Sequence, residues 1–303
     1  MNNNSYKSVL IIGMGLIGSS IARVIKEKNI SEKIYAVDNN KKTINITKDL
    51  NLVDEAYESL DNIPFQFDLI FICTPLSSYK NIFKLLNNFI KEPTLVTDVG
   101  STKVSVINDF KSVNNNNNIL FLPAHPIAGL EKSGPEHGFA KLFNNRYCII
   151  TPIKSDDKFI DVISNIWISF GMTVEIMNAE HHDRVLAMTS HIPQLIAYSV
   201  VGTATDLETQ MKDEVIKYSA AGFRDFTRLA GSDPIMWRDV YEKNKEAVLE
   251  MLGRFSEDLL TYQKAIRNND LKFLEEKFYK SKKIRKIIEE IGQAGTFDPT
   301  EKN

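Results

Sequence analysis

The sequence is poor in the residue types that build disulfide frameworks and thiolate metal sites. It has 2 Cys among 303 residues, Cys73 and Cys148, which are too few for a disulfide framework or a zinc site made of thiolates. Two such thiols suit a reducing compartment, so we expect a cytoplasmic protein. Imidazole chemistry must come from five side chains: His125, His137, His181, His182 and His191. No carboxylate or cysteine stands at ligand spacing from them, and we expect no metal site.

The chain also lacks an excess of charge of one sign and a long apolar run. Its 37 Lys and Arg stand against 39 Asp and Glu, a formal net charge of −2, which provides no basic field for nucleic acid. No apolar run approaches the ~20 residues that span a bilayer, and the Asn-rich start does not resemble a signal peptide. We therefore expect neither nucleic acid nor membrane as a partner. The 43% of hydrophobic residues is typical of a globular protein with room for about two domains.

Short apolar segments alternate with helical patterns in the first half of the chain. We expect strands at Val9–Ile12, Ile34–Val37, Leu69–Cys73, Thr94–Asp98, Ile119–Leu122, Tyr147–Thr151 and Thr173–Met177. Nearly continuous apolar strands with room for crossover helices indicate a parallel sheet covered on both faces.

Helical patterns replace the strand signals after about residue 178. Asp233-Pro234 predicts a helix start. Further along, an apolar stripe at helical spacing is formed by Val248, Leu252, Phe255 and Leu259. Asn268-Asn269-Asp270 is expected to break that helix, and Gly292 to end the last one. The apolar faces exceed what one small bundle needs, so we expect a homodimer through this region.

The first predicted strand runs into a glycine-rich dinucleotide-binding pattern. Gly13-Met-Gly15-Leu16-Ile17-Gly18 is G-x-G-x-x-G, followed by a predicted helix. In this pattern the first glycine permits a tight turn, the second lets the backbone approach a pyrophosphate, and the third allows close helix–strand packing. We therefore expect an α/β Rossmann-type dinucleotide-binding domain at residues 1–177. An all-α helical dimerisation domain follows at 178–295, with a tail at 296–303.

The second predicted strand ends next to Asp38, twenty residues after Gly18. A carboxylate there accepts hydrogen bonds from the ribose hydroxyls and repels a 2′-phosphate, so NAD is favoured over NADP. Lys41 and Lys42 follow closely and weaken that preference.

Three other segments follow strands and are expected at the same edge of the sheet. They are Cys73-Thr74-Pro75, the run from Asp98 through Gly100 and Ser101 to Lys103, and Ala124-His125-Pro126. Thr74 and Pro75 face the cofactor in this interpretation, although a simple strand terminator is the alternative.

His125 is the leading candidate for acid–base chemistry. A neutral imidazole at the nicotinamide end of the cleft is suited to accept a proton from a substrate hydroxyl while hydride leaves the same carbon. Ser101 is placed to hydrogen-bond that hydroxyl. A turn histidine bonded to backbone is the alternative interpretation of His125.

The other histidines are assigned simpler roles. His181 and His182 open a helix, and we expect both to cap it or face solvent. His191 precedes Pro193, which is expected to kink a helix and free backbone groups, so this segment either lines a site or holds a core histidine.

Arg224 and Arg228 share a helix face at i and i+4. Two like charges at this spacing are unfavourable unless an anion lies between them. Asp225 is one such anion, and a bound substrate carboxylate is the other.

Five blocks together give the sequence a family resemblance from about residue 8 to 292. They are Gly13–Gly18, His125–Gly134, Thr189–Pro193, Phe223–Arg228 and Asp233–Arg238. With these blocks the chain resembles the prephenate/arogenate (cyclohexadienyl) dehydrogenases of tyrosine biosynthesis. The resemblance implies oxidation of prephenate or arogenate by NAD+ with loss of CO2.

By this resemblance, His125 matches the catalytic histidine and Ser101 its hydrogen-bonding partner. Arg228 matches the arginine that binds the substrate carboxylate, and Glu131 and Trp237 match residues near the mouth of the site. Many members read Ser-His-Leu-Pro-His where this chain has Gln194 at the final position. Gln cannot become cationic, which leaves the choice between prephenate and arogenate open.

Two other classes of protein share part of the pattern. A different Rossmann dehydrogenase or reductase with a helical C-terminal domain needs the glycines and Asp38, but not His125 together with Arg228. A non-catalytic NAD-binding regulator keeps the glycines without needing His125, Ser101 or Arg228.

Overall fold

The structure is a computed structural model that describes residues 6–63, 66–154, 158–206, 213–215 and 217–291. Contacts divide the chain into two compact units, residues 1–248 and 249–303. The expected helix end at Gly292 and the tail at 296–303 lie outside the described residues.

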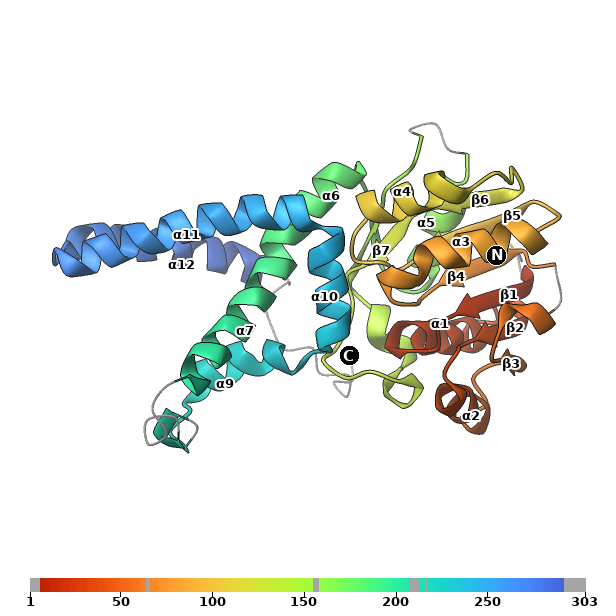
Figure 1. Ribbon diagram of the computed structural model, residues 1–303, viewed down its shortest axis with the longest axis horizontal. Coiled ribbons are helices and arrows are strands. Elements are labelled where there is room, and N and C mark those ends of the chain that lie inside the picture. The colour runs from red at the N-terminus through yellow and green to blue at the C-terminus, as the bar shows by residue number, and fades with distance from the viewer. Residues whose placement is uncertain (1–5, 64–65, 155–157, 207–212, 216, 292–303) are drawn as a thin grey trace. The chain divides into compact units, whose positions relative to one another are not determined.

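A six-stranded parallel sheet forms the centre of the first unit (Figure 1). Its order is β3-β2-β1-β4-β5-β6. The strands are β1 (Tyr6–Ile12), β2 (Ser31–Val37), β3 (Glu55–Tyr57), β4 (Leu69–Ile72), β5 (Thr94–Asp98) and β6 (Ile119–Leu122). In the middle, Val9 of β1 is in register with Ile34 of β2 and Leu69 of β4. β1 has β2 on one side and β4 on the other, so the strand order reverses between β1 and β4. A ligand crevice is expected beyond the carboxyl ends of these two strands.

Helices cover both faces of this sheet, as the sequence predicts. They include α1 (Leu16–Glu27), α2 (Lys41–Asp49), η2 (Leu76–Ser78), α3 (Tyr79–Phe89) and α4 (Val104–Val113). Successive residues of β1 enter different apolar clusters: Ile11 packs in one with Trp167, and Leu10 in the other with Phe83. Side chains of a strand alternate between faces, so these clusters are the two sides of one sheet.

The last two predicted strands form, but they belong to a separate small sheet. It has the order β7-β8-β9, made of β7 (Ala124–Pro126), β8 (Tyr147–Ile150) and β9 (Thr173–Ile176). β7 is antiparallel to β8, and β9 is parallel to β8. The predicted parallel sheet is therefore confirmed for the first five predicted strands, whereas the last two lie outside it. β3 and β7 were not predicted because three residues are too few for a visible periodicity.

Helical elements complete the first unit. They are the short helices η1 (Leu60–Asn62), η3 (Pro135–His137) and η4 (Ala140–Phe143), then α5 (Ile160–Ser169), α6 (Ala179–Leu186), the π-helical turn η5 (Ala187–His191), α7 (Ile192–Thr205), α9 (Ala221–Thr227), η6 (Arg228–Gly231) and α10 (Pro234–Lys243). The expected distortion next to Pro193 is the π-turn η5, because such a turn accommodates a proline placed early in the following helix. The predicted start of α10 is confirmed, since the side chain of Asp233 accepts hydrogen bonds from the amides of Ile235 and Met236.

The helical stretch Ala179–Thr205 is long and apolar enough to cross a membrane by length and composition alone, with a mean hydropathy of 1.2. The same stretch carries His182, Asp183, His191 and Gln194, all of which are buried in the first unit. It therefore contributes polar side chains to the interior of that unit.

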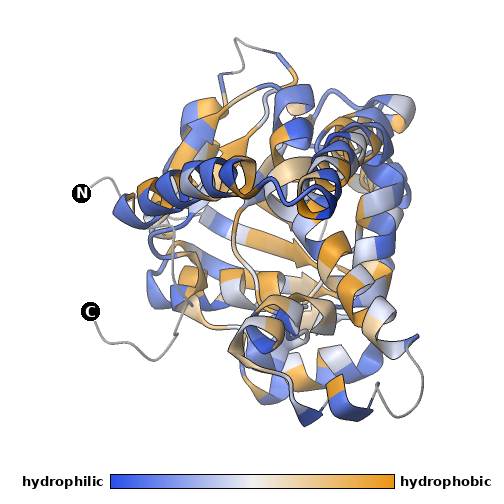
Figure 2. Cartoon of the chain, turned by 90° about the vertical axis from the view of Figure 1, so that its left-hand side faces the viewer, coloured by the Kyte–Doolittle hydropathy of each residue, from blue (hydrophilic) through white to orange (hydrophobic). Residues whose placement is uncertain are grey.

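The second unit contains the greater part of α11 (Lys245–Arg267) together with α12 (Leu271–Glu290). The predicted break between the helices is confirmed: Asn269 has a φ of 53°, and Asp270 caps α12 through the amide of Phe273. Tyr262 of α11 stacks on Phe278 of α12 with ring centroids 6.1 Å apart. Figure 2 shows apolar and polar residues interleaved along the long helices. Large apolar side chains remain more than half exposed: Leu259, Leu260, Ile266, Leu271, Phe278, Tyr279, Ile284 and Ile287.

Candidate active site

The glycine-rich loop has the geometry that a dinucleotide requires. Gly13 has a φ of +97°, and a Cβ on it would lie 2.7 Å from the carbonyl oxygen of Cys73. A Cβ on Gly18 would lie 2.0 Å from the carbonyl oxygen of Gly13, so α1 packs against the loop only because Gly18 lacks one. A Cβ on Gly15 would meet nothing within 4 Å. The backbone at the start of α1 is therefore open to an approaching ligand.

The N-terminus of α1 is free to bind an anion. Its first turn, which begins at Leu16 and Ile17, carries no acidic residue, and the N-cap Gly15 supplies no side-chain cap. Unsatisfied N–H groups and the partial positive charge of the helix then face the loop. Asp38 accepts hydrogen bonds from the amides of Met14 and Asn40, each at 2.9 Å. The residues present thus fit a dinucleotide, with the pyrophosphate at α1 and the ribose beside Asp38.

Thr74 and Pro75 follow β4 beside this loop, as predicted. Thr74 is half-buried and accepts a hydrogen bond from Ser78 at 2.7 Å. Gly100 is buried, and its amide donates to Asp98 at 2.8 Å. A Cβ on Gly100 would lie 2.9 Å from both Asp98 and Leu76, so this glycine permits close packing behind the crevice.

A buried ion pair joins the loop that carries Ser101 to the strand that carries His125. Lys103 Nζ donates to Asp98 Oδ2 at 2.6 Å and to the carbonyl oxygen of Ala124 at 2.7 Å. Asp98 Oδ1 accepts the amide of Ala124 at 3.1 Å. The sequence analysis placed Asp98 and Lys103 at this edge of the sheet but did not predict their ion pair. One residue ends a strand and the other precedes a helix, so no periodic pattern indicates that the two side chains meet.

His125 does not stand alone at the sheet edge. Its Nδ1 lies 2.8 Å from Nε2 of His182, and Nδ1 of His182 lies 2.8 Å from Oδ1 of Asp183. The expectation that His182 caps a helix or faces solvent is wrong, because its side chain is fully buried. For the adjacent His181 the expectation is confirmed: it is exposed, and its amide donates to the N-cap Asn178. Neighbouring residues of a helix point about 100° apart, and the sequence did not indicate which of the two turns inward.

Burial keeps the site histidines neutral. Desolvation, followed by the nearby His182, Lys103 and His191, holds the pKa of His125 well below its usual range. Burial lowers the pKa of His182 against the opposing effect of Asp183. Burial also lowers the pKa of His191 to about 4. A neutral imidazole at neutral pH is the form that can accept a proton.

A second histidine region adjoins this network. The side-chain amide of Asn244 donates to the carbonyl oxygen of Asp183 at 2.8 Å and lies 3.1 Å from Nδ1 of His191. The ring of His191 meets that of Trp237 edge-on, with centroids 6.0 Å apart. Nε2 of His191 and Nε1 of Trp237 are buried without a hydrogen-bond partner among the described residues. His191 and Trp237 therefore offer two donors next to the catalytic candidates.

The remaining predicted residues form a group near η6. Arg228 pairs with Glu131 at 3.1 Å, with side chains that are 53% and 36% exposed. Gln194 is buried, and its amide nitrogen donates to the carbonyl oxygen of Leu229 at 2.7 Å. Arg224 is exposed on α9. Gln194, in the first turn of α7, lies three residues after His191, the last residue of η5, which connects this group with the histidine region.

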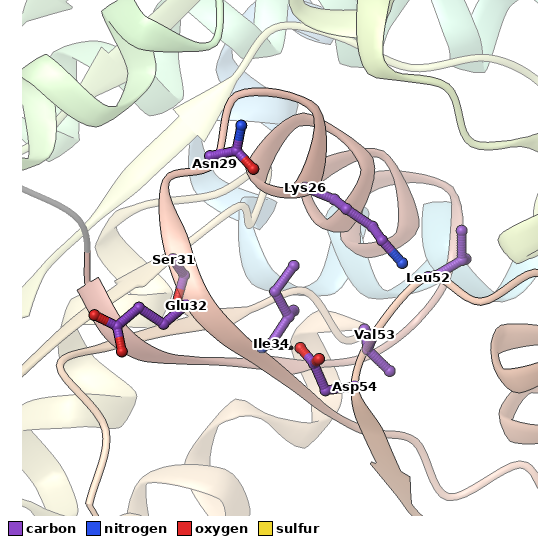
Figure 3. Close-up of a pocket in the computed structure, with 8 residues that line it drawn as sticks. All are labelled: Lys26, Asn29, Ser31, Glu32, Ile34, Leu52, Val53 and Asp54. Atoms are coloured by element: carbon purple, nitrogen blue, oxygen red, sulfur yellow. Dashed lines mark hydrogen bonds between the residues drawn. The ribbon is translucent and has the colours of Figure 1, made fainter.

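A hollow of about 160 Å³ elsewhere in the unit takes no part in this site (Figure 3). Lys26, Ser31 and Asp54 are among its lining residues. It lies at the amino end of β2, whereas Asp38 follows the carboxyl end of that strand.

A strand–glycine loop–helix unit, an acidic residue after the second strand and a neutral histidine at the same sheet edge define a dinucleotide-dependent α/β dehydrogenase. The family model "Prephenate dehydrogenase, nucleotide-binding domain" matches residues 21–176, and "Prephenate dehydrogenase, dimerization domain" matches residues 178–280. The chain belongs to the prephenate dehydrogenase family.

Individual relatives agree with this assignment. The chain is 36% identical to a cyclohexadienyl dehydrogenase of Zymomonas mobilis, over 92% of this chain and 95% of the relative. It is 31% identical to a prephenate dehydrogenase of Lactococcus lactis, over 93% and 78%. The crystal structure of Aquifex aeolicus prephenate dehydrogenase with hydroxyphenyl propionate and NAD+ is similar with a TM-score of 0.88 and 34% identity, covering 95% of this chain and 100% of that one.

Proposed function

We propose that this protein oxidises and decarboxylates prephenate, arogenate or both with NAD+, giving 4-hydroxyphenylpyruvate or tyrosine, CO2 and NADH. The observation that carries the proposal is His125, a neutral imidazole at the carboxyl edge of a sheet whose glycine loop fits a dinucleotide. The relatives named cyclohexadienyl and prephenate dehydrogenase support the choice of substrate.

His125 is the base in this reaction. It accepts the proton of the ring hydroxyl, and Ser101, on the loop that Asp98 links to β7, hydrogen-bonds the same hydroxyl. A bound NAD+ would supply the acceptor for the hydride that leaves the hydroxyl-bearing carbon. Loss of the ring carboxylate as CO2 then makes the ring aromatic, which drives the reaction forward.

Arg228 binds a carboxylate of the substrate. Its ion pair with Glu131 is partly exposed, so water screens it and a second carboxylate can compete for the guanidinium. Arg224 adds positive charge nearby. His191, Gln194 and Trp237 contact the rest of the substrate. The ring N–H groups of His191 and Trp237 have no hydrogen-bond partner within the described part of the chain, which supports this role. Gln194 presents a neutral amide, which accommodates either a keto or an amino side chain.

The cofactor is held by Gly13, Gly15, Leu16, Ile17 and Gly18 and by Asp38, with Thr74, Pro75 and Gly100 shaping the crevice. NAD is preferred over NADP because the carboxylate of Asp38 repels a 2′-phosphate.

We also place the protein in the cytoplasm, which suits its two free cysteines.

The chain is proposed to work as a homodimer. The division of function falls at residue 177, with cofactor binding in 1–177 and substrate binding and dimerisation in 178–295. The family description "dimerization domain" for 178–280 and the exposed apolar side chains of α11 and α12 support this arrangement. Sedimentation velocity tests it, and a monomer alone at micromolar concentration would exclude it.

The activity is tested by absorbance at 340 nm after mixing the protein with NAD+ and either prephenate or arogenate. We expect NADH with at least one substrate, and kcat/KM for the two gives the preference. His125→Asn is expected to lower kcat by roughly 100-fold or more, as for a positioned general base. No NADH with either substrate would rule out the proposed function.

A further inference from the structure

His182 lies between the candidate base and a carboxylate, with all its hydrogen-bonding capacity used. One ring nitrogen faces His125 and the other faces Asp183, both at 2.8 Å, and the side chain has no exposed surface. The helix that carries it, α6, runs past the start of α4 (Figure 1).

The carboxylate of Asp183 is held as an acceptor by two backbone amides. Oδ1 accepts the amide of Lys103 at 2.7 Å, and Oδ2 accepts the amide of Val104 at 3.0 Å. These amides belong to the first turn of α4, whose N-cap residue Lys103 supplies no side-chain cap of its own. Asp183 therefore caps α4 from another helix, and both of its oxygens act as hydrogen-bond acceptors there. The contact between Oδ1 of Asp183 and Nδ1 of His182 then needs a donor on the imidazole, so Nδ1 of His182 carries the proton.

This fixes the protons of both rings. A neutral His182 protonated on Nδ1 presents a lone pair at Nε2. Two lone pairs cannot face each other at 2.8 Å, so Nδ1 of His125 donates to His182. The proton of His125 then resides on Nδ1, and its Nε2 has the lone pair.

We propose that His182, oriented by Asp183, is a positioning residue that selects the form of His125 with a free Nε2; this inference rests on the proposed function of His125. The unit Asp183–His182–His125 resembles a serine-protease triad in one respect, since a carboxylate fixes the tautomer of the imidazole that it contacts. In this protein the imidazole of His182 lies between the carboxylate of Asp183 and the imidazole of His125, and its proton on Nδ1 determines where the proton of His125 resides.

The proposal is tested with a pair of substitutions that differ in hydrogen bonding. In His182→Gln, the amide can direct its NH2 to Asp183 and its oxygen to His125, which keeps the acceptor. In His182→Leu the acceptor is lost, and a buried Nδ1–H on His125 would be unsatisfied, which favours the form protonated on Nε2. We expect kcat to fall about 10- to 100-fold in His182→Leu and by less than about 10-fold in His182→Gln. KM for NAD+ should change little in either variant.

The control is His181→Leu, which alters an exposed histidine on the same helix and should turn over like the unchanged protein. Circular dichroism and Tm show whether each variant folds. His182→Leu turning over as fast as the unchanged protein would overturn the proposal. Equal losses in His182→Leu and His182→Gln would also overturn it, because they would indicate packing alone.

A second measurement is independent of activity. Imidazole 15N spectra of the unsubstituted protein labelled at histidine report which nitrogen carries the proton, and His125→Asn identifies the signals of His125. We expect the proton of His125 on Nδ1, and finding it on Nε2 would overturn the proposal. If neither substrate yields NADH, the proposed function fails, while the 15N spectra still decide the tautomer.

Discussion

Lys103 and Asp98 form an ion pair from which water is excluded, with Nζ 2.6 Å from the carboxylate and neither side chain exposed. Asp98 ends β5 and Lys103 precedes α4, and both also bind the backbone of Ala124, next to His125. The pair therefore fixes the distance between the loop of Ser101 and the strand of the candidate base.

Removing one member of this pair is expected to destabilise the fold. Lys103→Met leaves Asp98 as a buried charge without its cation, which costs about 3–5 kcal/mol. Urea unfolding followed by circular dichroism measures the free energy of unfolding. Lys111→Met, an exposed position on α4, is the matched control and should change it by no more than about 0.5 kcal/mol. Equal stability of the two variants would contradict a structural role for the pair.

Arg228 is expected to act on substrate binding more than on turnover. Arg228→Gln removes a charge-assisted hydrogen bond to a carboxylate, which corresponds to a rise of about 10- to 100-fold in KM for prephenate or arogenate. Steady-state kinetics with saturating NAD+ provide the measurement. Arg254→Gln removes an arginine that is also partly exposed and paired with a glutamate, and should leave KM unchanged. A loss confined to kcat would argue against a binding role for Arg228.

Asp38 is expected to determine the choice of dinucleotide. Asp38→Ser removes the charge that repels a 2′-phosphate and keeps a short polar side chain, so kcat/KM for NADP+ should rise relative to NAD+ by about 10-fold or more. Asp49→Ser, at an exposed position of α2, serves as control. An unchanged ratio of kcat/KM for the two dinucleotides would indicate that Asp38 only supports the glycine loop, where it accepts a hydrogen bond from the amide of Met14.

The buried histidines predict a loss of stability toward acid. Burial lowers the folded-state pKa of His125, His182 and His191 below the value of ~6.5 in the unfolded chain. The unfolded chain therefore binds more protons than the folded chain below pH 6.5. The free energy of unfolding has its full value above that pH and falls as the pH decreases. With a pKa of about 4, His191 alone would contribute a loss of about 2 kcal/mol at pH 5.

Urea unfolding between pH 8 and pH 5 measures this dependence. His191→Gln removes one titrating group and should flatten the decline, whereas His181→Asn, at an exposed position, should leave it unchanged. The same slope in all three proteins would show that His191 titrates normally in the folded state.

Local patterns in the sequence predicted the strand, the glycine loop and the acidic residue that together fit a dinucleotide. The glycines, the strand before them and Asp38 lie within about thirty residues, and Gly13 and Gly18 are required by close contacts to Cys73 and to the loop itself. The start of α10 at Pro234 and the helix break at Asn269 were likewise predictable, because caps and turns depend on neighbouring residues.

Long-range partners were beyond the reach of such patterns. His125 and His182 are 57 residues apart, and Lys103 and Asp183 are 80 apart. Nothing in the local sequence of α6 distinguishes the inward-facing His182 from the exposed His181, since both precede the same polar residues.

The sequence by itself therefore determined which loop fits a dinucleotide and which histidine is the candidate base, because glycine turns, strand ends and helix caps are set by residues close together in the chain. Only the tertiary structure decided how that base is protonated. The proton position depends on a carboxylate, a second imidazole and a helix start that are brought together by the packing of α6 against α4 and β7.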